Sequence, residues 1–228
     1  MADKRIILPH GGYRKLIVYR KSDTIYQGTV VFCRRFLPEF GDRTVDQMTQ
    51  AARSCKQNIA EGSAAAATSK ETEIHLTNVA KASLDELYED YEDHIKSNGL
   101  ARWASDDEKF QVARKMAIDH PDWDFWRPIF ESRPAETVCN LQMTIIRQTQ
   151  SLLNGMLERQ EDEFRKFGGI RERMHAARTA ARGDGWDKAI YSRLDDADTL
   201  GELESRASEI RRRVAGAVAS IKRRKGWG

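Results

Sequence analysis

Proline is scarce in this chain, with 5 among 228 residues, and its 15 glycines do not exceed the ordinary share. Disordered chains are poor in apolar residues, whereas hydrophobic residues make up 40% of this sequence and charged residues 32%. The composition therefore argues against disorder and predicts a helix-rich globular protein with few strands. The length is sufficient for two structural units with a sizeable core.

Long apolar runs are also missing. No apolar stretch reaches the roughly 18 residues that a membrane-spanning helix needs. The start of the chain carries Asp3, Lys4 and Arg5 and lacks the apolar stretch of a signal peptide. We therefore expect a protein that is neither secreted nor inserted in a membrane.

Cysteine is rare, and the residues present, Cys33, Cys55 and Cys139, are odd in number. Each falls within an apolar helical pattern, with no second Cys or His at the spacing of a metal site. We expect reduced core thiols, which indicates a cytoplasmic protein.

Apolar residues recur at steps of three and four along the chain, which is the pattern of amphipathic helices. The expected long helices cover residues 13–36, 44–62, 68–96 and 134–167. Their expected core residues are Leu16, Tyr19, Tyr26, Val30 and Phe32, then Val45, Met48, Ala52, Cys55 and Ile59, then Leu76, Ala80, Leu84, Leu87 and Tyr91, and finally Val138, Leu141, Ile145, Leu152 and Met156.

The ends of these helices are marked by capping and breaking residues. Thr44 with Gln47, and Thr68 with Glu71, have the spacing of capping boxes, and Pro134 suits a first turn. The expected stops are Pro38 and Gly41, Gly62, Asn98 with Gly99, and Gly168 with Gly169.

Residues 100–133 differ from the long segments and read as an elaborated connection packed on the helices, with one short helix near residues 106–117. The connection holds Trp103, Trp123 and Trp126. Tryptophans can stack on nucleic-acid bases, but the neighbouring aspartates would repel a phosphate backbone. Packing in the core or at a subunit interface is the favoured interpretation.

The predicted fold class is all-α, an antiparallel up-down four-helix bundle with a helical C-terminal extension. The bundle would occupy residues 1–167, with the elaborated connection at 100–133. A basic helical suffix would follow at 168–228, with its last amphipathic helix at about 200–225.

Several short motifs resemble a bacterial family of four-helix-bundle proteins. The family includes proteins encoded in intervening sequences of ribosomal RNA genes and the accessory variability determinants of diversity-generating retroelements. The matching segments are LIVY at Leu16–Tyr19, QMTQA at Gln47–Ala51, NIAEGS at Asn58–Ser63 and SLDEL at Ser83–Leu87, and FRKFGGIRER at Phe164–Arg173 resembles the tail of the subgroup with a C-terminal suffix.

The resemblance implies a homopentameric ring without enzymatic activity. In the retroelement branch it also implies binding to nucleic acid (RNA or DNA) and to a reverse transcriptase. This chain departs from the family at Thr49 and Gln50, where many relatives carry a pair of arginines, and at residues 64–67, which are alanines where relatives often place an arginine. These changes remove positive charge from the bundle, so the suffix is the expected place for phosphate contacts.

The motif at the end of the second helix has two interpretations. Asn58 and Glu61, next to Gly62, could form a polar site, but a structural role is favoured. In that role Asn58 is a buried polar residue that fixes the register between helices, and Glu61 organises the following turn.

No set of residues with the spacing of a catalytic or metal site is evident. The histidines are isolated from one another, and neither His75 nor His94 has a Glu three residues before it, as a di-metal bundle requires. We expect no enzyme activity, no metal and no cofactor.

Charge is unevenly distributed along a chain whose net charge is +3. Residues 85–136 contain 14 acidic and 7 basic residues, whereas residues 201–228 contain 8 basic and 3 acidic ones. The candidate nucleic-acid contacts are the basic residues of the suffix: Arg171, Arg173, Arg211, Arg212, Arg213, Lys222, Arg223, Arg224 and Lys225.

Two hypotheses for the function follow. The first is an oligomeric accessory protein that binds nucleic acid through the suffix, favoured by the absence of acidic residues after Glu209. The second is a structural or protein–protein interaction module, favoured by the missing arginines at Thr49 and Gln50.

Overall fold

The structure, a computed structural model, describes residues 12–37, 43–172, 174–175, 177–179 and 200–225. Its elements are a 3₁₀ turn, η1 (Tyr13–Lys15), and the helices α1 (Ile17–Phe36), α2 (Arg43–Ala65), α3 (Lys70–Ser97), α4 (Glu108–Asp119), α5 (Trp123–Ser132), α6 (Ala135–Phe167) and α8 (Leu200–Lys225). No strand occurs among the described residues, which confirms the all-α expectation for that part of the chain. None of the described helices is long and apolar enough to cross a membrane.

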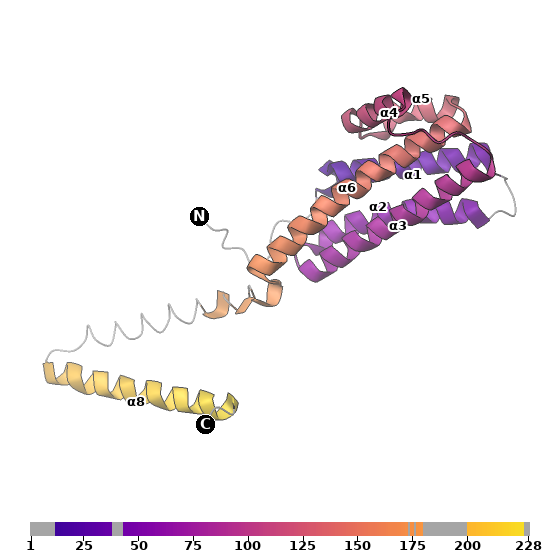
Figure 1. The fold of residues 1–228 in the computed structure, drawn as a ribbon. Helices are drawn as coiled ribbons and strands as arrows, with labels where there is room; N and C mark the ends of the chain where they lie inside the picture. Colours follow the sequence, from indigo (N-terminus) through magenta and orange to yellow (C-terminus); the bar gives the residue numbers. More distant parts are fainter. Residues whose placement is uncertain (1–11, 38–42, 173, 176, 180–199, 226–228) are drawn as a thin grey trace. The chain divides into compact units, whose positions relative to one another are not determined.

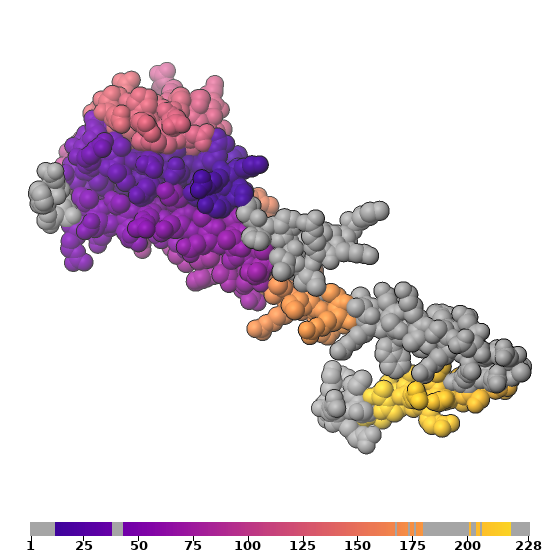
Figure 2. All heavy atoms as spheres, turned by 180° about the vertical axis from the view of Figure 1, so that it is seen from behind, coloured from indigo at the N-terminus to yellow at the C-terminus, as the bar shows by residue number. Residues whose placement is uncertain are grey.

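The chain divides into two compact units, residues 1–173 and 174–228. In the first unit α1 packs against α2, α2 against α3, α3 against α6, and α6 against α1. The shorter α5 and α4 lie against α1 and α6 and form an added layer (Figures 1 and 2). The four long helices therefore enclose a bundle-like core.

The core consists of the apolar side chains that face inward from these helices. Among the largest that are fully buried are Phe32, Met48, Leu84, Tyr91 and Ile145. Four of the five expected core residues of α2, namely Met48, Ala52, Cys55 and Ile59, are buried, and Val45 is partly buried against the core. The heptad spacing of that segment was therefore a reliable guide to its inner face.

The inner face of α1 differs from the expected one. Leu16 is 37% exposed and Tyr19 and Tyr26 only line the core, whereas Val18 and Ile25 are buried with Phe32. The physical reason is that α1 has three neighbours, α2, α6 and α5, so burial is spread around most of the helix.

Two helix ends also differ from expectation. Gly62 lies inside α2, which continues to Ala65, because α3 approaches closely there: a Cβ on Gly62 would lie 3.4 Å from the Cβ of Leu76. The N-cap of α3 is Ser69 rather than Thr68, and its hydroxyl accepts a hydrogen bond from the backbone N–H of Thr72 at 3.1 Å.

The start of α2 was also placed one residue late. The helix begins at Arg43, so Thr44 lies within it rather than at its cap. Pro38 and Gly41, the expected stop of the first helix, lie outside the described residues.

The connection between α3 and α6 holds two helices, where the sequence indicated one. α5 was missed because Pro128 lies inside it, and proline normally interrupts a helix. Its place is fixed by tertiary contacts: Trp126 is fully buried and its indole N–H donates to the carbonyl oxygen of His120 at 2.7 Å. Trp103 and Trp123 pack against the core, in agreement with the packing interpretation.

The last long helix of the first unit ends as expected, with Gly168, at φ 63°, as C-cap, whereas Pro134, expected in the first turn, is the N-cap and the helix begins at Ala135. Its buried face turns away from one expected residue, however. Leu152 is 37% exposed, and Leu153 is buried in its place. A seven-residue repeat is slightly shorter than two helical turns of 3.6 residues, so positions at heptad spacing move gradually off the buried face.

Candidate nucleic-acid interface

The basic residues at the start of the candidate interface are exposed on α8. Arg211, Arg212 and Arg213 all lie open to solvent, and Arg213 Nη2 forms an ion pair with Glu209 Oε1 at 2.9 Å. Successive helical residues point about 100° apart, so these arginines fan around the helix. They cover about 200° of the helix circumference, and the remaining side carries Ile210, Val214 and Val218.

The second basic cluster repeats the first along the same helix. Lys222 follows Arg211 by 11 residues within α8, which is about three turns, or about 16 Å at 1.5 Å per residue. Arg223 and Arg224 follow Arg212 and Arg213 in the same way. The backbone of α8 thus places each arginine of the first cluster on the same face as a basic residue three turns later. The side chains of residues 222–225 lie outside the described ones.

The remaining expected contacts lie near the boundary of the two units. Arg171 is exposed, in a helical segment that begins after the glycine pair. The backbone N–H of Gly169 donates to Glu172 Oε2 at 2.8 Å, so an acid stands one residue from Arg171. Arg173 lies outside the described residues.

An apolar stripe runs between the basic positions of α8. Val214 and Val218 are four residues apart, on one face, and are 43% and 47% exposed. Ile210, one turn earlier, is partly exposed. α8 is therefore amphipathic as well as basic. Its apolar stripe could contact another protein, as the hypothesis of a protein–protein interaction module requires.

The surface between α2 and α3 has the opposite charge. A cavity of about 730 Å³ there is lined by Asp46, Glu86, Glu89, Asp90 and Asp93. Burial, and then the charges of Glu86, Asp93 and Glu89, raise the pKa of Asp90. Carboxylates that repel one another would also repel phosphates.

One of the two positions at which the sequence lacks the arginine pair of the resembled family lies on this acidic surface. Gln50 lines the cavity together with Gln47, whereas Thr49 is not among its lining residues. Arg43 is the basic residue in the lining.

A cluster of arginines that sequence reasoning missed surrounds a smaller cavity of about 300 Å³. Arg102, Arg114 and Arg147 line it, together with aromatic residues that include Tyr88 and Trp103. The Arg147 guanidinium lies 3.8 Å from the centre of the Tyr88 ring, and Arg102 pairs with Glu92. The arginines come from three separate segments, so no sequence pattern could have joined them.

The motif at Asn58 is polar but local. Asn58 is half-buried, and its amide donates to the carbonyl oxygen of Ser54 at 2.8 Å in its own helix. The polar link between α2 and α3 is instead the 2.9 Å contact of the Ser54 and Ser83 hydroxyls. Glu61 is exposed and Gly62 is buried against α3.

The comparisons with known proteins identify no relative: no family model, no curated protein and no solved structure matches this chain. In the part of the chain that the structure describes, no three His, Cys, Asp or Glu side chains are grouped as they would be around a metal ion.

Proposed function

We propose that this protein is a non-enzymatic, oligomeric accessory protein that binds RNA or DNA through α8. The observation that carries the proposal is the exposure of Arg211, Arg212 and Arg213 on a long helix whose basic residues repeat after three turns. Such side chains reach phosphates without reading base edges, so binding would be largely independent of sequence.

The first unit is proposed to be an antiparallel up-down four-helix bundle that presents this extension. Along each pair of neighbouring helices, the numbers of the contacting residues rise on one helix as they fall on the other. On α1 and α6, Lys21 contacts Gln148 and Ile25 contacts Gln142. On α3 and α6, Glu73 contacts Gln160 and Asp85 contacts Gln150.

The pairs α1 with α2 and α2 with α3 follow the same rule. Val18 and Ile59 line one cavity, while Asp23 pairs with Lys56 at 3.1 Å. Gly62 near the end of α2 lies beside Glu73 near the start of α3. Numbers that rise on one helix fall on its neighbour, as in an up-down bundle.

The acidic cavity between α2 and α3 supports placing the interface on α8 rather than on that face. A phosphate backbone there would meet Glu86, Asp90 and their neighbours. Burial first, and then the repulsion of these neighbours, already raises the pKa of Asp90. Phosphate contacts on the first unit would have to use the arginines around Tyr88, of which Arg102 already pairs with Glu92.

The assembly is proposed to be a homopentamer in the cytoplasm, with a reverse transcriptase as protein partner, on the strength of the family resemblance. Several copies would multiply the weak phosphate contacts of one helix. Light scattering should then give five times the 26.1 kDa of one chain. A mass equal to one chain would overturn this part of the proposal.

The test of nucleic-acid binding is a salt titration of a labelled RNA and a labelled DNA duplex against the full chain. One variant replaces Arg211, Arg212, Arg213, Lys222, Arg223, Arg224 and Lys225 with Gln. Affinity should fall for all sequences alike, and the slope of log affinity on log salt should flatten, because fewer counterions are released.

A matched control removes the same charge from the first unit. It replaces seven exposed basic residues with Gln: Arg53, Lys96, Lys109, Lys115, Arg127, Arg165 and Lys166. The control should bind much as the parent does. A third variant, with Gln at Arg102, Arg114 and Arg147, tests the arginine cavity. If the third variant alone loses binding, the interface lies there and not on α8.

The alternative is a structural or protein–protein interaction module. The exposed stripe of Val214 and Val218 favours it, because an amphipathic helix can bury such a stripe against another protein. Absence of RNA and DNA binding by the full chain at low salt would favour this alternative. Substituting both valines with Ser would then weaken the protein contact.

A further inference from the structure

The arginine cavity beside Tyr88, of about 300 Å³, is positively charged and has no acid in its wall. Arg102, Arg114 and Arg147 line it, and its other lining residues are uncharged. Arg102 comes from the segment between α3 and α4, Arg114 from α4 and Arg147 from α6. All three are exposed, so a ligand that enters from solvent can reach them. Like charges that converge in this way repel one another.

The protein itself compensates only part of this charge. Glu92 pairs with Arg102, and it also pairs with Lys96 at 3.1 Å. Among the residues that the structure describes, neither Arg114 nor Arg147 has a carboxylate partner. Two guanidinium groups at one cavity therefore keep their charge without a counter-ion from the described part of the chain.

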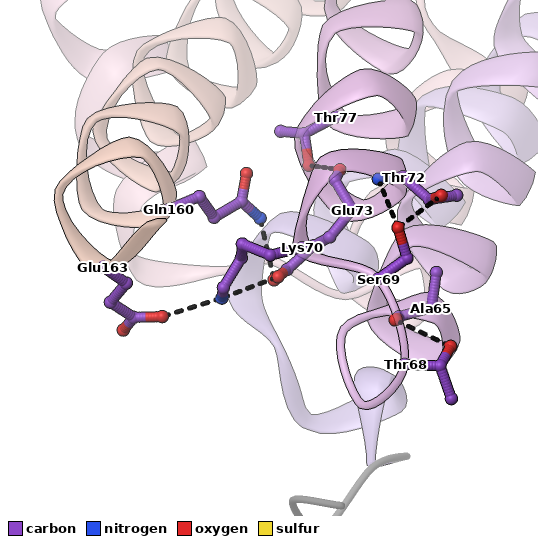
Figure 3. Close-up of polar contacts among 9 residues, drawn as sticks. All are labelled: Ala65, Thr68, Ser69, Lys70, Thr72, Glu73, Thr77, Gln160 and Glu163. Atoms are coloured by element: carbon purple, nitrogen blue, oxygen red, sulfur yellow. Dashed lines mark hydrogen bonds and ion pairs between the residues drawn. The ribbon is translucent and has the colours of Figure 1, made fainter. Parts of the chain in front are cut away.

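Converging charges are handled differently at the start of α3 (Figure 3). There, Lys70 Nζ lies 2.7 Å from Glu73 Oε2 and 2.7 Å from Glu163 Oε2. Lys70 and Glu73 belong to α3 and Glu163 to α6, the helices that also carry Tyr88 and Arg147. The same two helices thus bring opposite charges together at one place and leave like charges together at the other.

Two of the arginines are held in place by one buried ring. Tyr88 is 7% exposed, and its hydroxyl accepts a hydrogen bond from Arg102 Nη2 at 2.6 Å. The Arg147 guanidinium lies 3.8 Å from the centre of the same ring, which is the geometry of a cation–π contact. Both guanidinium groups are therefore positioned before a ligand arrives, which lowers the entropy cost of binding an anion.

We propose that this cavity binds a small organic phosphate monoester. Near neutral pH a phosphate monoester carries a charge of about −1.5 to −2 and three acceptor oxygens, which matches two unpaired guanidinium groups in charge and in hydrogen bonding. A single carboxylate or sulfate ester carries one negative charge. The volume lies at the lower end of the range of about 300 to 1,000 Å³ that small-molecule sites have. The partly buried rings of Trp103 and Phe110 would contact the organic body.

A nucleic-acid strand fits this cavity less well than a monoester does. Each internal phosphate of a strand is a diester with one negative charge, and the strand continues on both sides of it. A monoester ends in its phosphate, so it can enter a small cavity with the phosphate first. The cavity has no residue of α8 in its lining, so the site is independent of the proposed nucleic-acid interface.

The experiment compares phenyl phosphate with phenyl sulfate, which have nearly the same size and shape. At about pH 7.5 the phosphate is mainly a dianion, whereas the sulfate is a monoanion. Each is titrated into the full chain by calorimetry. Phenyl sulfate should bind at least about tenfold more weakly, because it offers one charge fewer to the guanidinium groups. Inorganic phosphate should also bind more weakly than phenyl phosphate, because it has no organic body to cover the apolar part of the wall.

The place of binding is read from methionine methyl groups labelled with ¹³C. The Met143 methyl, in the wall of the arginine cavity, should shift and saturate with phenyl phosphate. Those of Met116 and Met156, which line other cavities, should stay in place. An equal response of all three would indicate general binding to the surface and would overturn the proposal.

Arg114→Gln is the variant that tests the charge of the cavity. The carbonyl oxygen of Arg114 accepts a hydrogen bond from Gln148 Nε2 at 2.8 Å, and the substitution retains that contact. Affinity for phenyl phosphate should fall by about tenfold or more. Lys115→Gln, at the next exposed position of α4 and outside the cavity lining, removes the same charge and is the matched control. It should leave the affinity nearly unchanged.

Tyr88→Phe tests the positioning of the arginines. It removes the hydroxyl that accepts from Arg102 and keeps the ring under Arg147, so affinity for phenyl phosphate should fall severalfold while Arg147 stays in place. The variant with Gln at the seven basic residues of α8 should bind phenyl phosphate as the parent does. Loss of binding in that variant would move the phosphate site to α8 and overturn the proposal.

Three further outcomes would contradict the proposed site. The first is equal affinity of the parent chain for phenyl phosphate and phenyl sulfate. The second is equal affinity of the parent and Arg114→Gln for phenyl phosphate. The third is inorganic phosphate that binds as tightly as phenyl phosphate, which would mean that the cavity does not recognise an organic body.

Discussion

The amide of Gln142 on α6 lies against the backbone of Gly28 on α1. Gln142 is fully buried, and its Nε2 donates to the carbonyl oxygen of Ile25 at 3.1 Å. A Cβ on residue 28 would overlap this amide and would lie 2.6 Å from Phe130 Cε1. The close approach of α1, α5 and α6 therefore depends on a missing side chain.

Gly28→Ala is expected to lower the free energy of unfolding by about 1 to 3 kcal/mol, because the added methyl group must displace buried neighbours. Gly155→Ala on α6 is the control, since its Cβ would meet only the end of the Arg159 side chain at 3.6 Å. Helix propensity alone should make that change neutral or stabilising by up to about 1 kcal/mol. Urea unfolding of both variants gives the comparison, and equal midpoints would contradict the described packing.

Met48→Ala and Ile59→Ala should each cost about 2 to 5 kcal/mol, because they leave cavities in the core. The two side chains are 0% and 4% exposed. Val112→Ala, at a position that is 52% exposed, should change stability by less than about 0.5 kcal/mol. Guanidinium unfolding midpoints measure the effect of all three substitutions. If neither core variant shifts the midpoint, the face of α2 that carries Met48 and Ile59 is not the inner face.

Lys21 should make stability rise with pH in the alkaline range. Its ammonium is 3% exposed and donates to the carbonyl oxygen of Ala117 and to Gln148 Oε1. Burial lowers the pKa of Lys21 from 10.5 to about 8. Between these values the unfolded chain binds a proton that the folded chain does not, so the free energy of unfolding increases as the pH rises.

The measurement is the difference in unfolding free energy between the parent chain and Lys21→Met as a function of pH. Other titrating groups cancel in this difference. The parent should gain on the variant between about pH 8 and pH 10.5, and the difference should be constant below that window. A constant difference across the window would show that Lys21 titrates as an exposed lysine does.

The thiols should be unreactive in the folded chain. Cys33, Cys55 and Cys139 are buried, and burial raises the pKa of Cys55, and that of Cys139 to about 12. A thiol reagent such as 5,5′-dithiobis(2-nitrobenzoate) should label none of the three at neutral pH and all three in denaturant. Rapid labelling without denaturant would mean that the core opens locally.

Periodicity alone predicted the long helices and most of the inner face of α2, because the steps from Met48 to Ile59 follow the helical repeat. The stop at Gly168 was also predictable, since its positive φ of 63° suits a glycine. Helix periodicity and helix ends depend on residues that lie close together in the sequence. The exposure of the arginines of α8 was predictable in the same way, because charged side chains at those positions leave nothing apolar to bury.

Only the tertiary structure decided the rest. α5 forms across Pro128 because Trp126 is buried and held by His120, which the composition of the segment could not reveal. Leu152 and Leu153 differ in burial although they are adjacent and identical, because the direction of α6 past its neighbours selects one of them. The amide nitrogen of Gln160 donates to a carboxylate of Glu73, which lies 87 residues away in the sequence. Contacts of this range depend on how helices meet, and a helical repeat carries no information about the neighbour that it will meet.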